Sequence, residues 1–191
     1  MVNADSFSKA LLQRAAERGI EVDPLKLQKL TYYCQGYHLA AFGKPAVDAE
    51  LNAWDHGPVV KEMYVAYQHF GSKPISLELQ QDLFSQLEES VKRVIDWVLD
   101  MHGQFRSWDL RNQSHKEAPW MAHYNPQIGC VDYQAISHEE LSSFFKEQLA
   151  GRQDAYFQEL MSAADCESVE VPDSIETTDE FYRWVMDDSQ S

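Results

Sequence analysis

The strongest constraint on the fold is a helical segment that begins at Asp23-Pro24 and ends at Gly43. An Asp cap followed by proline at the first helical position is a start signal, and Gly43 before Lys44-Pro45 is a stop signal. Apolar residues recur at helical spacing on two sides of this helix. They are Leu27, Leu30, Cys34, Tyr37 and Ala41 on one side, and Leu25, Tyr32 and Leu39 on the other. A helix that is apolar on two sides needs cover on both, so we expect it to be central and buried.

Further start and stop signals predict the elements around this helix. Helices are expected from Asp5 or Ser6 to about Arg18, from Pro58 to Phe70, from Leu87 to His102, from Ser107 to about Gln113, at Pro119, and after the capping box of Ser137 and Glu140. Residues 46–55 are expected to be extended, as a small hairpin. The predicted fold is mainly α (α+β): a compact domain of about six helices with a small β-hairpin over residues 1–150, then an acidic C-terminal extension over 151–191.

Acidic side chains dominate the charge, with 31 Asp and Glu against 16 Lys and Arg and a formal net charge of −15. Phosphate binding relies on Lys and Arg that displace counterions, so we do not expect unaided binding to DNA, RNA or an anionic membrane. The excess is uneven, since residues 1–150 carry a net −6 and residues 151–191 a net −9. The extension therefore holds more than half of the charge.

The cysteines and histidines do not form a pattern typical of a metal site or a catalytic centre. Three scattered cysteines without a CxxC pair are typical of a reduced, intracellular protein. Cys34 and His38 lie four apart and could supply two zinc ligands, but no second pair completes the site. A core cysteine beside a hydrogen-bonded histidine is the preferred interpretation, and no metal or other cofactor is expected. Nucleophile and phosphate-loop signatures are absent from the sequence, so we do not expect an enzyme.

The ends and apolar runs of the sequence bear on its location. The first residues lack a cationic region followed by an apolar run, so no signal peptide is indicated. No apolar run approaches the roughly 20 residues that span a bilayer. We therefore expect a cytoplasmic protein that does not bind membranes.

Two short segments combine tryptophan, histidine and proline. They read Ala53-Trp54-Asp55-His56-Gly57-Pro58-Val59-Val60 and Ser114-His115-Lys116-Glu117-Ala118-Pro119-Trp120. On a structural interpretation Gly57 permits a turn, Pro58 starts a helix, and Trp54 fills the core. On a functional one, His56 lies exposed beside the free N–H groups of that helix start, where a carboxylate or carbonyl could dock.

Together with a third segment, these two resemble the Panacea domain family. Leu27-Gln28-Lys29-Leu30-Thr31-Tyr32-Tyr33-Cys34-Gln35-Gly36-Tyr37-His38-Leu39-Ala40 is similar to its LQKLLYYAQGWHLA pattern, the Trp54 segment running on to Tyr64 to its AWxxGPV pattern, and the His115 segment to its THxxxPW pattern. Thr31, Cys34, Tyr37 and Ser114 depart from the usual residues. The resemblance covers about residues 5–150 and does not extend to the acidic extension.

Panacea domains occur in SocA-like antitoxins and in GepA-like proteins of phages and mobile elements. The resemblance implies a non-enzymatic antitoxin that neutralises a toxin protein by direct binding, and the acidic charge would steer it toward a basic toxin. One branch of the family delivers its toxin to the ClpXP protease, so the resemblance also raises ClpXP as a partner. The candidate binding residues carried over from the motifs are Gln28, Lys29, Tyr33, Trp54, His56, Tyr64, His115 and Trp120.

Two other functions remain open on the sequence. An enzyme or small-ligand module would use a pocket lined by Trp54, His56, His115 and Trp120, provided that these residues converge. A DNA mimic would carry rows of carboxylates at phosphate-like spacing over the body of the domain.

The acidic extension holds the last candidate binding residues. Thr177 or Thr178 can cap a short amphipathic helix that carries Phe181, Trp184 and Val185. A helix this short is unstable alone in water, so it either docks on a partner or on the domain, or belongs to a disordered solubilising tail. Phe181 and Trp184 are the predicted docking side chains.

Overall fold

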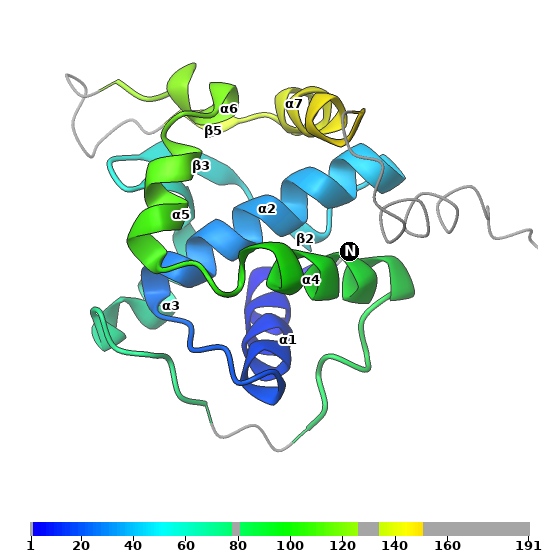
Figure 1. Cartoon of the computed structure of the whole chain (residues 1–191), viewed down its shortest axis with the longest axis vertical. Helices are drawn as coiled ribbons and strands as arrows, with labels where there is room; N and C mark the ends of the chain where they lie inside the picture. The colour runs from blue at the N-terminus through cyan, green and yellow to red at the C-terminus, as the bar shows by residue number, and fades with distance from the viewer. Residues whose placement is uncertain (1, 78–80, 126–133, 151–191) are drawn as a thin grey trace, which may run out of the picture.

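The computed structural model describes residues 2–77, 81–125 and 134–150. In chain order its helices are α1 (Ala4–Glu17), α2 (Pro24–Phe42), α3 (Lys61–Tyr67), the 3-10 turn η1 (Gln68–Phe70), α4 (Glu89–His102), α5 (Ser107–Ser114), α6 (Ala118–Met121) and α7 (His138–Ala150). The strands are β1 (Val2–Asn3), β2 (Val47–Asp48), β3 (Leu51–Trp54), β4 (Gly57–Val60) and β5 (Ala135–Ile136). The predicted mainly helical fold with a small hairpin is confirmed (Figure 1), but the hairpin is formed by β3 and β4 rather than within residues 46–55, and β2 pairs in parallel with β1. The acidic extension and its predicted helix lie outside the described residues.

Helix α2 runs through the centre of the molecule, with α7 on one side and α1 and α4 on the other (Figure 1). The Asp23 carboxylate accepts a 2.8 Å hydrogen bond from the backbone N–H of Lys26 and caps the first turn. Gly43 ends the helix in the left-handed conformation, at φ 66°. Every residue from Lys26 to Ala40 is buried, which confirms the expected central helix.

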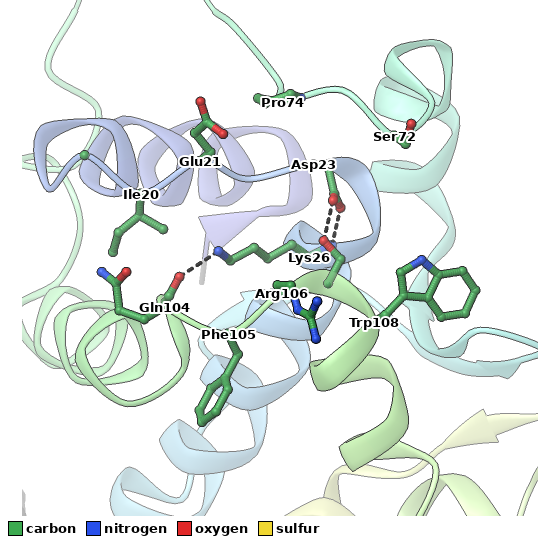
Figure 2. A pocket seen from close by; sticks show the side chains of 13 residues that line it. Ile20, Glu21, Asp23, Lys26, Ser72, Pro74, Gln104, Phe105, Arg106 and Trp108 are labelled. Carbon is green, nitrogen blue, oxygen red and sulfur yellow. Dashed lines mark hydrogen bonds between the residues drawn. The ribbon is translucent and has the colours of Figure 1, made fainter.

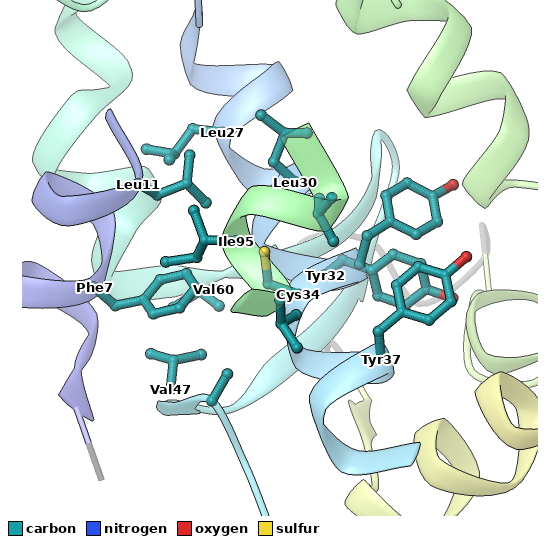
Figure 3. Close-up of a cluster of buried hydrophobic side chains, with 14 of the residues drawn as sticks. Phe7, Leu11, Leu27, Leu30, Tyr32, Cys34, Tyr37, Val47, Val60 and Ile95 are labelled. Carbon is teal, nitrogen blue, oxygen red and sulfur yellow. The ribbon is translucent and has the colours of Figure 1, made fainter. Parts of the chain in front are cut away.

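The core forms where α1, α2, α4 and the strands meet (Figure 3). Phe7 and Leu11 of α1 face Leu27 and Leu30 of α2, and Ile95 of α4 completes the contact. On its other side α2 packs against α7, where Phe145 lies edge-on to Tyr32, Tyr33 and Tyr37. The phenyl ring lies directly over Gly36, where a side chain would leave no space for it.

The predicted helix start at Pro58 is wrong. Residues 57–60 form strand β4, which pairs antiparallel with β3 so that Trp54 lies opposite Gly57, and α3 begins three residues after Pro58 at Lys61. Proline fits here because β4 is an edge strand of the sheet order β4-β3-β5, where one backbone N–H can be dispensed with. The cap of α1 also differs, because Asn3 rather than Asp5 or Ser6 accepts the hydrogen bond, from the Ser6 backbone N–H.

Strand β5 and helix α7 attach to the far side of the hairpin. Ile136 lies opposite Leu51 of β3, in the pairing that makes β3 the central strand. The capping box then starts α7: Glu140 Oε2 accepts from the Ser137 N–H at 3.0 Å, and Ser137 Oγ accepts from the Glu140 N–H at 3.2 Å. This predicted capping box is confirmed.

Candidate functional site

Two buried polar side chains of α2 hold strand β4 in place. The Lys29 Nζ donates a 2.7 Å hydrogen bond to the carbonyl oxygen of Pro58. Gln28 contacts both backbone groups of Val60, accepting from its N–H at 2.8 Å and donating to its carbonyl at 3.2 Å. Because Gln28 and Lys29 are both buried, these hydrogen bonds are shielded from water. They fix the hairpin to the central helix.

Lys29 lies in a tightly filled site. Burial lowers the pKa of its ammonium group well below the usual value; the positive charge of Arg111 lowers it further, and Glu117 opposes the shift. Gly57 passes this site at φ 95°, and a Cβ atom there would lie 2.7 Å from Lys29 Nζ and 2.8 Å from Ser114 Oγ. Glycine is therefore required at position 57, both by the backbone conformation and by the space.

Helices α5 and α6 hold the tip of the hairpin from the other side. The Trp120 Nε1–H donates to the carbonyl oxygen of Trp54 at 2.9 Å, and Arg111 donates to that of Asp55 at 3.3 Å. His115 stacks on the Trp120 ring at 3.7 Å between centroids. Burial, together with the nearby charge of Arg111, lowers the pKa of His115 to about 4.

A further hydrogen bond joins α2 directly to the α5–α6 corner. The Tyr33 hydroxyl donates to Glu117 Oε1 at 3.0 Å. Burial raises the pKa of this carboxyl group, while the hydroxyl groups of Tyr32 and Tyr33 oppose the shift. The three motif segments thus meet at one place. Hydrogen bonds from motif side chains join each segment to another.

The outer surface of the hairpin carries aromatic side chains. Trp54 is half-buried and lies edge-on to Tyr64 of α3 at 5.0 Å, while His56 is exposed and lies 5.7 Å from the Trp108 ring of α5. We call Trp54, His56, Tyr64 and Trp108 the hairpin face. A hollow of about 450 Å³ opens beside it. Its lining is Pro24, Leu25, Gln28, Trp54, Asp55, His56, Val59, Tyr64, Gln68 and Gly71.

A second hollow, of about 680 Å³, lies at the start of α2 (Figure 2). Within it the Lys26 ammonium group donates to the Gly103 carbonyl at 2.6 Å, and Ser107 donates to the Asp23 carboxylate. Trp108 lies at its edge, where it also contacts His56 of the hairpin.

The structure divides the predicted binding residues into two groups. Gln28, Lys29, Tyr33 and Trp120 are buried, and they connect the elements of the fold. Trp54, His56 and Tyr64 reach the surface, whereas His115 is half-buried against Trp120. Phe181 and Trp184 lie outside the described residues.

His56 does not lie at a helix start, as the functional interpretation expected. It occupies the turn between β3 and β4, because residues 57–60 are a strand. Of the four residues of the proposed pocket, Trp54 and His56 line the smaller hollow described above, and His115 and Trp120 are not among its lining residues.

Trp108 is the surface residue that sequence reasoning missed. It is 58% exposed although it is a tryptophan, and the Arg111 guanidinium lies 5.7 Å from its ring centroid. The spacing of Trp108 and Leu110 indicates this exposure. The two residues are two positions apart and do not share a helix face, so burial of Leu110 leaves Trp108 on another side of α5.

The described residues offer no group of three or more His, Cys, Asp and Glu side chains that could hold a metal ion. Cys34 is buried, and His38 uses both ring nitrogens, at 2.7 Å from the Lys44 carbonyl and 3.1 Å from Ser90 Oγ. The interpretation of a core cysteine beside a hydrogen-bonded histidine is confirmed. Within the same described ranges, no helix combines the length and apolarity that crossing a bilayer requires.

Several carboxylates that a DNA mimic would need are engaged in ion pairs. Asp96 of α4 binds both Arg14 and Arg18 of α1, and Arg18 also binds Asp100. Lys44 binds Glu88 at 2.6 Å. These pairs neutralise the acidic side chains between α1 and α4, so this surface gives the DNA-mimic hypothesis no support.

The fold and site define a small helical scaffold whose shared motifs hold an aromatic hairpin at the surface. Residues 27–121, which include all three motif segments, match the family described as "Antitoxin SocA-like, Panacea domain". Antitoxin SocA of Caulobacter vibrioides (strain NA1000 / CB15N) is 30% identical over 129 residues, which are 62% of this chain and 69% of that protein. The chain belongs to the SocA-like antitoxin family. No solved structure matches it significantly.

Proposed function

We propose that this chain is an antitoxin that neutralises a toxin protein by binding it directly, without catalysis. The observation that carries the proposal is that some residues of the family motifs hold the hairpin in place while others lie exposed on it. Gln28, Lys29 and Trp120 hold the hairpin from within, and Trp54 and His56 remain at the surface on that rigid support.

The hairpin face has the chemistry of a protein-binding surface. Tyr64 and Trp108 are 41% and 58% exposed, and large aromatic side chains contribute most to the energy of protein interfaces. A hairpin that is already held by hydrogen bonds loses little conformational freedom when it binds a partner. More of the contact energy therefore appears as affinity. We therefore assign toxin binding to Trp54, His56, Tyr64 and Trp108.

Charge supports a basic toxin. The net charge of −15 attracts a positively charged partner at long range and raises the rate of encounter more than the final affinity. Association with the toxin should accordingly slow as the salt concentration rises.

Co-expression with the adjacent open reading frame tests this function. We expect the neighbouring product to arrest growth alone, to be harmless together with this chain, and to co-purify with it at fixed stoichiometry. A neighbour that is harmless alone, or that remains toxic while this chain is expressed and bound to nothing, contradicts the proposal.

The same strains decide what happens to the bound toxin. A stoichiometric inhibitor leaves the half-life of the toxin unchanged or longer, whereas an adaptor for ClpXP shortens it, and deleting the protease restores it. Toxin half-life measured with and without ClpX therefore separates the two mechanisms.

A further inference from the structure

The two hollows at the start of α2 lie next to each other, and we call them together the groove. Their linings share consecutive residues, since Asp23 and Ser72 belong to the larger hollow and Pro24 and Gly71 to the smaller. Trp108 connects them across the groove, lining the larger hollow while its ring lies 5.7 Å from His56 of the smaller. Glu21 and Trp108 belong to the larger hollow, which Figure 2 shows, and Asp55 of the hairpin belongs to the smaller one.

The charged groups of the groove differ in how they are used. The Lys26 ammonium group is turned to the Gly103 carbonyl, and the Asp23 carboxylate caps α2 and accepts from Ser107. Arg106 is paired with Asp109 at 3.0 Å. These three groups therefore already form hydrogen bonds or an ion pair within the protein.

Two other lining carboxylates, those of Glu21 and Asp55, are exposed. Glu21 acts electrostatically on Lys26, and the Asp55 carboxylate interacts with the Tyr124 hydroxyl group. Among the described residues, neither Glu21 nor Asp55 forms an ion pair with a Lys or Arg side chain, and both residues are exposed. The nearby Arg111 lines neither hollow and donates to the Asp55 backbone carbonyl. Each hollow therefore presents one exposed carboxylate that forms no ion pair with a Lys or Arg side chain of the described residues.

The larger hollow also carries exposed aromatic side chains. Trp108 is 58% exposed, and Phe105, which also lines the larger hollow, is 47% exposed. Exposed aromatic side chains along a concave surface are typical of a site that a partner covers.

We propose that this groove binds an extended segment of the partner protein that carries a basic side chain near each end and apolar side chains between them. The basic groups pair with Glu21 and Asp55, and the apolar side chains cover Trp108. This inference rests on the proposed function, because it names the chemistry by which the toxin would be recognised.

A pair of synthetic peptides tests the inference with the full-length chain and without any toxin. The probes are acetyl-Arg-Leu-Leu-Leu-Arg-amide and its counterpart with Glu in place of both Arg residues. We expect the basic peptide to shift the indole N–H resonance of Trp108 in a saturable manner, more weakly at high salt, and the acidic peptide to leave it unchanged. Equal shifts with both peptides, or no shift with either, would overturn the proposal.

Charge-neutralising variants locate the binding. The double variant E21Q/D55N should weaken binding of the basic peptide about threefold to tenfold. The matched control D48N/E50Q removes the same charge from two exposed residues that line neither hollow, and should bind as the wild type does. Equal affinities of the two double variants overturn the assignment.

Measurements of toxin binding and neutralisation then distinguish a wrong groove from a wrong antitoxin function. If the wild type neutralises the toxin and E21Q/D55N binds that toxin as tightly as D48N/E50Q does, the groove is wrong and the antitoxin function stands. If the wild type never neutralises its neighbour, the proposed function fails, whatever the peptides show.

Discussion

The ammonium group of Lys29 donates a 2.7 Å hydrogen bond to the carbonyl oxygen of Pro58, and this contact joins the central helix to the hairpin. Both residues belong to family motifs, and both are buried. Burying the amine of Lys29 costs free energy through desolvation unless it forms this hydrogen bond. The contact therefore specifies where the hairpin lies, which a purely apolar core would not do.

Replacing Lys29 by methionine should change how stability depends on pH. The pKa of Lys29 is lower in the folded state than in the unfolded chain, so the unfolded state binds more protons below the usual lysine pKa. The contribution of Lys29 to the free energy of unfolding therefore rises with pH and falls as the pH is lowered. Denaturant titrations of the wild type and Lys29→Met between pH 7 and pH 9.5 should show the wild type gaining relative to the variant. A constant difference across that range contradicts the burial of the amine.

Gly57→Ala should destabilise the domain far more than Gly43→Ala. Both glycines have positive φ, but a methyl group at position 57 meets Lys29 and Ser114, whereas nothing lies within 4 Å of one at position 43. We expect a loss of about 2–4 kcal/mol at position 57, from backbone strain and crowding, against about 1 kcal/mol at position 43, which lies in the left-handed region. Thermal or urea unfolding measures both, and equal losses would show that the Lys29 site has room to relax.

Gly36→Ala should separate α7 from α2. An added Cβ would lie 2.1 Å from the Phe145 ring, so the ring or the helix has to move. We expect a loss of about 1–3 kcal/mol, and partial rescue when Phe145→Leu is added, because the smaller side chain relieves the overlap. A double-mutant cycle from urea unfolding gives the coupling energy, and strictly additive losses contradict this packing.

Trp108→Ala should weaken toxin binding without destabilising the fold. The side chain is 58% exposed, so the free energy of unfolding should change by no more than about 0.5 kcal/mol. Loss of an aromatic anchor should lower toxin affinity by about tenfold or more. Val65→Ala is a matched control, because Val65 is 59% exposed and lines neither hollow. Calorimetry with the toxin compares the variants, and equal affinities would remove Trp108 from the hairpin face.

Phe181→Ala/Trp184→Ala tests the docking hypothesis for the acidic extension. If these side chains bury against the toxin, the double variant should bind it at least about tenfold more weakly, with the charge of the extension unchanged. The affinity should then fall further when the whole segment 165–191 is deleted. Unchanged affinity in both variants favours a solubilising tail.

The helices of this fold could be predicted because their signals are local. Asp23-Pro24 and Gly43 lie at the ends of α2, and the Ser137–Glu140 capping box starts α7, with each contact made within a few residues. Position 58 was misassigned because proline is equally suited to a helix start and to an edge strand. The pairing of Trp54 with Gly57 decided between them.

The motifs predicted residues that lie close together in the fold, but not the role of each one. The motifs named Lys29, Tyr33 and Trp120 together with Trp54 and His56, and nothing in their spacing separates those that hold the hairpin from those that face outward. Exposure made that division, and it also added Trp108, which no motif contains.

By itself, the sequence determined the helical class of the domain, its central helix and its family, because caps, apolar periodicity and motifs are properties of neighbouring residues. Only the tertiary structure decided that Lys29 is buried against Pro58, that the hairpin face includes Trp108, and that Glu21 and Asp55 line neighbouring hollows. The physical reason is that burial, pairing and concavity arise between segments distant in the chain, whose approach depends on how all the elements pack.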